Sequence, residues 1–191
     1  MGCYTTRVVS ATEVNDIFNI LVNGVNYTID NKHMRIEKNY RVYLILYTIC
    51  NVGLRVSDIL QLTPNKIKGS QLTLVEKKTN KQQVRQISNN VYSKLMDYCL
   101  DNNIKSNDLI FKITERNVQK VLKKVCEYLN LENVSTHSFR KFYATSIYQK
   151  SDNDLFLVKE LLNHSFISTT QRYIGKDYDK INKYSAMNLI E

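Results

Sequence analysis

The stretch HSFRKFYATSIY, residues 137–148, places His137 and Arg140 three positions apart in a pattern that predicts a helix. Residues at this spacing project from the same helix face, so an imidazole and a guanidinium lie side by side. Thr136, just before them, is a candidate N-cap. A helix start, an arginine and a histidine donor all favour negative charge, which suits a phosphate. An ordinary pair of polar surface residues has the same spacing.

A second stretch, LLNHSFISTTQRYIG, contains another of the chain's three histidines. His164 closes one predicted helix, and Tyr173 lies nine positions further on, within the next. The chain has 13 tyrosines, so Tyr173 taken alone is equally a packed aromatic residue. Only the combination with other residues favours a functional role.

The segment NVGLRVSDILQL, residues 51–62, places Arg55 two positions after Gly53, which ends an apolar helix. Asp58 follows one turn later, where it can pair with Arg55 and hold the orientation of its guanidinium. The alternative is an ordinary surface ion pair.

Lysines cluster in EKKTNKQ, residues 76–82, at the turn of a predicted hairpin. Lys78 closes the first strand and Lys81 opens the second. A solvated, charged turn is one interpretation of this cluster. The other is a lysine that the hairpin extends into a DNA groove.

Length and composition indicate one globular domain. The chain has 191 residues, 43% of them hydrophobic, enough for a core that does not depend on disulfides or metals. Its net charge is +9, and residues 51–150 carry 17 Lys and Arg against 8 Asp and Glu. Because these basic residues are dispersed among apolar ones, the charge is expected on a folded surface facing a polyanion. Ribosomal, membrane-surface and heparin-binding proteins have similar compositions.

The cysteines favour free thiols. No CxxC pair occurs, and Cys50 and Cys99 lie inside apolar runs, so neither a disulfide framework nor a zinc site is expected. A reducing, cytoplasmic setting is the simpler interpretation. No stretch approaches the roughly 18 apolar residues of a membrane span.

Apolar residues at helical spacing predict a mostly helical chain. Ser10 and Glu13 form a capping-box pattern at the start of the first helix. The expected helices run from Ser10 to Asn23, Tyr40 to Val52, Leu54 to Leu62, Asn90 to Asn102, Thr114 to Leu129, Thr136 to Gln149, Asp154 to Asn163, Ser168 to Ile174 and Tyr178 to Leu189.

Strands are expected in one region. Alternating apolar and polar residues from Gln71 to Lys78 and from Gln82 to Ser88 predict a hairpin, to which Lys66 to Lys68 adds a third strand. The segment from Tyr27 to Asn39 is expected to be a polar loop, with His33 an ordinary loop residue. The predicted fold class is α+β, mainly α, with a small three-stranded antiparallel sheet.

Four motifs occur in order: G-L-R-x-S-D-x-L, K-T-N-K, T-H-S-F-R-x-x-x-A-T and L-L-N-H-x-x-I-x-T-T-Q-R-Y. In the order and spacing of these motifs, and in the apolar residues around them, the chain resembles the catalytic domain of the tyrosine recombinase family. This family includes phage integrases and Xer recombinases. The resemblance implies the fold of DNA breaking-rejoining enzymes. It assigns catalytic roles to Arg55, Lys78, His137, Arg140, His164 and Tyr173, with Lys77 as a fallback for Lys78.

The resemblance also implies a reaction. Tyr173 would attack a DNA phosphate to give a 3′-phosphotyrosine link, Lys78 would protonate the leaving 5′ oxygen, and neither a cofactor nor a metal would be needed. The main expectation is a site-specific recombinase or integrase. A type IB topoisomerase that relaxes DNA shares this chemistry, and a DNA-binding regulator that has lost catalysis shares the fold.

Expected partners are double-stranded DNA, other copies of the chain in a tetrameric synapse, and accessory DNA-bending proteins, with no membrane. The expected location is the cytoplasm of a bacterium or phage-infected cell, at the nucleoid. The resemblance runs from about residue 10 to the end, so residues 1–191 are expected to form one catalytic domain without a separate N-terminal core-binding domain. Such a chain is either a minimal form or a fragment.

Two positions depart from the family's usual pattern. Asn163 stands where glycine is frequent, and Asp58 where glutamate is usual. Asn adopts the left-handed backbone conformation more readily than most residues, and Asp keeps the charge, so activity is expected to survive both changes.

Overall fold

The computed structural model describes residues 6–29, 32–75 and 82–174. The chain divides into two compact units, residues 1–143 and residues 144–191. The assignment of residues 1–191 to one catalytic domain stays a prediction.

The first unit begins with helix α1, Ala11–Asn23, and the predicted capping box is confirmed. The Ser10 hydroxyl accepts a hydrogen bond from the Glu13 amide, and the Glu13 carboxylate accepts one from the Ser10 amide. These two bonds satisfy amides that the helix itself leaves without partners. The helix ends at Gly24, whose φ is 72°.

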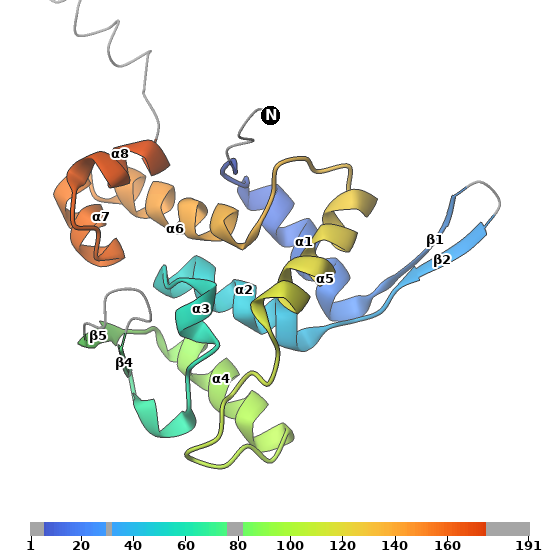
Figure 1. Cartoon of the computed structure of the whole chain (residues 1–191), viewed down its shortest axis with the longest axis horizontal. Helices are drawn as coiled ribbons and strands as arrows, with labels where there is room; N and C mark the ends of the chain where they lie inside the picture. The colour runs from blue at the N-terminus through green and yellow to red at the C-terminus, as the bar shows by residue number, and fades with distance from the viewer. Residues whose placement is uncertain (1–5, 30–31, 76–81, 175–191) are drawn as a thin grey trace, which may run out of the picture. The chain divides into compact units, whose positions relative to one another are not determined.

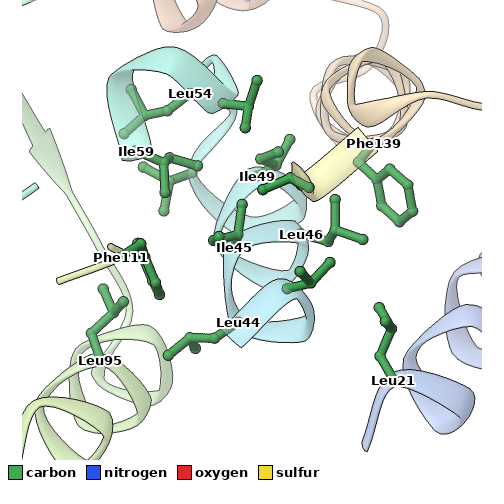
Figure 2. Packing of buried hydrophobic residues seen from close by; sticks show 14 of the residues in the cluster. Leu21, Leu44, Ile45, Leu46, Ile49, Leu54, Ile59, Leu95, Phe111 and Phe139 are labelled. Atoms are coloured by element: carbon green, nitrogen blue, oxygen red, sulfur yellow. The ribbon is translucent and has the colours of Figure 1, made fainter. Parts of the chain in front are cut away.

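Helix α2, Tyr40–Val52, passes through the core, as its apolar composition predicts. Figure 2 shows its buried side chains among those of the surrounding elements. Leu44, Ile45 and Leu46 on α2 are all 0% exposed. Neighbours in the same cluster come from α1, from α4 and from segments further along the chain: Leu21, Leu95, Phe111 and Phe139.

Gly53 ends α2 in the left-handed conformation, with φ 70° and ψ 18°. An added Cβ would lie 2.4 Å from the ring of Tyr143, so the aromatic ring occupies the space that any other residue needs. Backbone conformation and packing therefore both require glycine here.

After Gly53 the first unit continues with three short strands, a 3₁₀ turn and further helices. They are α3 (Val56–Ile59), the 3₁₀ turn η1 (Pro64–Lys66), β3 (Ile67–Lys68), β4 (Gln71–Val75), β5 (Gln82–Gln86), α4 (Asn89–Asp101), α5 (Glu115–Tyr128) and the start of α6 (Thr136–Lys150). The predicted three-stranded antiparallel sheet is confirmed, in the order β3-β4-β5. The turn with Lys77, Lys78 and Lys81 lies outside the described residues.

A second antiparallel sheet contradicts the prediction of a polar loop from Tyr27 to Asn39. Strands β1, Val25–Ile29, and β2, Lys32–Ile36, pair with Tyr27 opposite Met34 and form a ribbon that extends away from α1 and α5 (Figure 1). His33 accordingly lies on a strand. The prediction was wrong because β2 is almost wholly exposed and polar. Its partner strand is held through Tyr27, whose ring lies 4.8 Å from that of Tyr128 on α5, a contact that local sequence does not reveal.

The second unit contains the end of α6, then α7, Leu155–Leu162, and α8, Ile167–Ile174. Helices α7 and α8 pack against each other. Asn163 ends α7 with φ 51° and ψ 46°, the left-handed conformation expected of it. The last predicted helix, Tyr178 to Leu189, lies outside the described residues.

The cysteines that the structure describes are free thiols. Cys50, Cys99 and Cys126 are free thiols, as expected, and Cys3 lies outside the described residues. Burial raises the pKa of the Cys126 thiol to about 11. Within the described segments, no helix is both long and apolar enough to span a bilayer.

Replacing Leu46 with alanine should lower the free energy of unfolding by about 2–5 kcal/mol, since the fully buried side chain leaves a cavity at the centre of the core. Leu100→Ala is the matched control, because Leu100 is 75% exposed. Its effect should stay within about 0.5 kcal/mol. Urea unfolding followed by circular dichroism measures both, and equal effects would contradict the assignment of α2 to the core.

Gly53→Ala should destabilise the protein by more than Gly69→Ala. Both glycines have positive φ, +70° and +54°, so each alanine incurs the left-handed backbone cost of about 1–2 kcal/mol. Gly69 has open space around its Cα, whereas Gly53 faces Tyr143. Thermal unfolding of the two variants isolates the contact with the ring; equal losses would mean that Tyr143 moves aside freely.

Candidate active site

The start of α6 is held by hydrogen bonds from the preceding loop. The Ser135 hydroxyl accepts a hydrogen bond from the His137 amide at 3.2 Å, and the Ser135 amide donates to the Ser138 hydroxyl at 3.2 Å. The expected cap, Thr136, is instead the first residue of the helix, and its hydroxyl accepts a bond of 2.8 Å from the Gln119 amide group on α5. Ser135 therefore takes the capping role that the sequence suggested for Thr136.

Arg140 lies on this helix with only 2% of its surface exposed. Its Nη1 donates a hydrogen bond of 2.6 Å to the carbonyl oxygen of Gly53. A buried guanidinium is stable only when its donors meet acceptors, and a backbone carbonyl at the end of α2 is a rigid one. The bond therefore fixes the guanidinium relative to the core helix.

Arg55 follows Gly53 by two residues and is the N-cap residue of α3. Its Nη1 lies 3.9 Å from Oδ2 of Asp58, which is 1% exposed. The predicted pairing of these residues is confirmed. A buried carboxylate on the next turn orients the arginine while leaving part of its guanidinium accessible.

Three of the six predicted residues, Arg55, His137 and Arg140, line one pocket of about 200 Å³. Its other lining residues are Leu54, Val56, Ser57, Glu115, Gln119 and Thr136. Of the polar residues among these, sequence reasoning had identified Thr136 but not Ser57, Glu115 or Gln119. Glu115 and Gln119 are spaced by four on α5, which places them on one helix face, but only the packing of α5 beside α6 turns that face toward the pocket.

The neighbouring cations change the titration of His137. Burial and the positive charges of Arg140, Lys141 and Arg55 lower the pKa of its imidazole below the usual 6.5. The side chain still has much of its surface open to solvent, which screens these charges and limits the decrease. With His137 neutral, Arg55 and Arg140 still supply positive charge to the pocket, which suits an anion.

His164 and Tyr173 contact each other in the second unit. Their ring centroids lie 5.0 Å apart with an interplanar angle of 65°. The Nδ1 atom of His164 lies 3.0 Å from the Thr170 hydroxyl, and this hydrogen bond orients the ring. His164 is 7% exposed and Thr170 is 0% exposed. His164, just after α7, and Tyr173, on α8, thus form an ordered pair of contacting rings.

The remaining predicted residue, Lys78, lies outside the described residues, as does its fallback Lys77. Across the part of the chain that the structure describes, no group of three or more His, Cys, Asp or Glu side chains is arranged to hold a metal ion. The expectation that no metal or cofactor takes part stays a prediction.

Comparison with known proteins places the chain in a family. Residues 9–180 match the Phage integrase family. The probable integrase/recombinase YoeC of Bacillus subtilis (strain 168) is 31% identical over 156 residues, which cover 78% of this chain and 84% of that protein. Tyrosine recombinase XerC of Caldanaerobacter subterraneus subsp. tengcongensis is 30% identical over 154 residues. These residues cover 75% of this chain but only 43% of that relative.

Solved structures share the fold. The XerH site-specific recombinase in a post-cleavage complex with palindromic difH superposes with a TM-score of 0.71 at 20% identity, over 94% of this chain and 52% of that one. The catalytic domain of bacteriophage HP1 integrase gives 0.63 at 17% identity, over 97% of this chain and 99% of that one. The mainly helical α+β fold predicted from sequence is thereby confirmed. With its motifs in register and its fold shared, the chain belongs to the phage integrase family of tyrosine recombinases.

Proposed function

We propose that the chain is a site-specific DNA recombinase or integrase that cuts and rejoins DNA through a covalent link to Tyr173. One observation carries the proposal: Arg55, His137 and Arg140, from different parts of the sequence, line the same small pocket. The names of the relatives, integrase/recombinase and tyrosine recombinase, support it.

The pocket suits the charge of a phosphodiester. The negative charge of the phosphodiester repels an incoming nucleophile, and further negative charge gathers on its non-bridging oxygens in the transition state. Arg55 and Arg140 supply planar, permanently charged groups for these oxygens, each already oriented by its own partner. Such donors stabilise the transition state without reorganising, as in an oxyanion hole.

In the proposed reaction the Tyr173 oxygen forms a bond to phosphorus while the bond from phosphorus to the 5′ oxygen breaks. The Tyr173 hydroxyl releases its proton to solvent water, and the leaving 5′ oxygen gains a proton from the Lys78 ammonium. His137 and His164 donate further hydrogen bonds to the phosphate. Because the phosphotyrosine link conserves the energy of the phosphodiester, attack by another 5′ hydroxyl rejoins the DNA without ATP.

The proposed partners are double-stranded DNA, further copies of the chain in a synapse, and accessory DNA-bending proteins. Solved relatives include XerH bound to difH and a lambda integrase dimer bound to a COC′ core site. The surplus of basic residues between positions 51 and 150 supports DNA as the partner. We place the protein in the cytoplasm of a bacterium or phage-infected cell, at the nucleoid.

Incubation with a target duplex should give a covalent protein–DNA adduct that survives a denaturing gel. Tyr173→Phe should abolish this adduct, because phenylalanine has no oxygen to attack phosphorus. Tyr148→Phe, which removes a hydroxyl from α6, is the matched control and should leave the adduct intact. An adduct that persists in Tyr173→Phe would remove this tyrosine from the reaction.

The same experiment separates the alternatives. Tight binding without an adduct from the intact protein would favour a catalytically silent DNA-binding regulator. An adduct accompanied by relaxation of supercoiled DNA, with no strand exchange between two duplexes, would favour the topoisomerase.

DNA binding should raise the pKa of His137. In the free protein, burial and the neighbouring cations favour the neutral imidazole, whereas a bound phosphate offsets the charge of the cations and favours the imidazolium. The folded pKa is depressed when DNA is absent, so binding takes up a proton. DNA affinity should therefore increase as the pH falls toward the depressed pKa of His137 in the free protein, about 4.

Titration by NMR of protein carrying ¹³C-labelled histidine, with and without duplex, measures this change. The His137 signal is assigned by its loss in His137→Gln. A pKa that stays the same or falls when duplex is added would contradict phosphate binding beside His137.

A further inference from the structure

The segment before α1, residues 6–9, contacts the loop that leads into α6. The Arg7 amide donates a hydrogen bond of 3.1 Å to the carbonyl of Asn133, and Arg7 Nε donates one of 2.9 Å to the carbonyl of Glu132. Both acceptors lie a few residues before Ser135, the residue that caps α6. One arginine thus holds this loop through its backbone and its side chain.

The same guanidinium is anchored on α1. Arg7 Nη1 lies 2.9 Å from one Glu13 carboxylate oxygen, and Nη2 lies 2.6 Å from the other. Glu13 is itself fixed, since it accepts a bond from the Ser10 amide in the capping box. The hydrogen bond from Arg7 is the main cause that lowers the pKa of Glu13 to about 2. Arg7 therefore joins α1 to the loop before α6.

Two further contacts extend this link to α6 itself. The Thr6 carbonyl accepts a hydrogen bond from the Lys141 ammonium, adjacent in sequence to Arg140. The Thr6 hydroxyl lies 3.4 Å from that of Ser135. On the side of α5, Gln119 holds Thr136. The first turns of α6 are thus bounded by α5 on one side and by residues 6–9 on another.

We propose that Arg7 is a positioning residue for the phosphate pocket: by fixing the 132–135 loop to α1, it sets the place of His137 and Arg140. This inference rests on the proposed function of that pocket. Arg7 is not one of the residues that line the pocket, and it acts through the helix start. Misplacement of a catalytic group by about 1 Å can cost on the order of 10²-fold in rate.

Arginine is required here by its shape. Nε reaches the loop carbonyl while both terminal nitrogens meet the Glu13 carboxylate. Lysine keeps the charge but has a single nitrogen, so it cannot make both sets of bonds. Arg7→Lys therefore separates the geometric link from simple charge.

The test compares single-turnover adduct formation at saturating duplex with duplex affinity measured by anisotropy. Arg7→Lys should slow adduct formation by about 10-fold to 100-fold while affinity changes less than about 3-fold, since the pocket is displaced but the charge is retained. Glu13→Gln is the second variant. Glutamine is still a capping-box residue, but it removes the carboxylate that anchors Arg7. This variant should therefore also slow adduct formation. Arg35→Lys is the matched control, because Arg35 on β2 forms an exposed ion pair with Glu37.

The ¹³C signal of His137 provides a readout that does not depend on activity. At a temperature where all variants are folded by circular dichroism, it should shift in Arg7→Lys and Glu13→Gln but not in Arg35→Lys. Wild-type rates in both test variants, or parallel losses of affinity and rate, would overturn the positioning role. If the wild type formed no adduct, the proposed function would fail, and an unchanged His137 signal would separately overturn the link.

Discussion

The hydrogen bond from Arg140 to the carbonyl of Gly53 joins the candidate pocket to the core. Helix α2 passes through the core of the first unit, with seven of its side chains buried, and it ends at Gly53. Gly53 turns the chain in a conformation that glycine adopts at low cost, and the ring of Tyr143 excludes any larger residue. The buried guanidinium thereby receives a rigid acceptor, and Arg55 emerges two residues later, beside it. One backbone turn positions both arginines.

Much of the fold could be predicted from sequence because its signals are local. The Ser10–Glu13 capping box, the apolar α2 helix with its glycine stop, and the alternating strands β4 and β5 all depend on residues near one another in the chain. The β1–β2 ribbon could not be predicted, since it is stabilised where Tyr27 meets Tyr128, about a hundred positions away. Its exposed second strand resembles a loop in composition.

The candidate site was predictable where its residues fall in motifs. Arg55, His137 and Arg140 line one pocket, as spacing and family resemblance suggested, and His164 contacts Tyr173. The supporting residues were not predictable, because their roles arise from tertiary contacts. Ser135 caps α6 in place of Thr136, Gln119 meets Thr136 across two helices, and Arg7 bonds to a loop 125 residues later in the chain. Such contacts leave no periodic pattern in the sequence.

In the proposed reaction, Arg55 and Arg140 neutralise the charge of the phosphate. The most direct measurement compares single-turnover cleavage by wild type and Arg55→Ala on two duplexes, one with an ordinary phosphodiester at the cut position and one with a neutral methylphosphonate there. Using the same two proteins on both duplexes cancels differences in folding. Loss of Arg55 should slow cleavage at least ~10²-fold on the charged linkage and far less on the neutral one. Equal losses on both linkages would contradict charge neutralisation by this pocket.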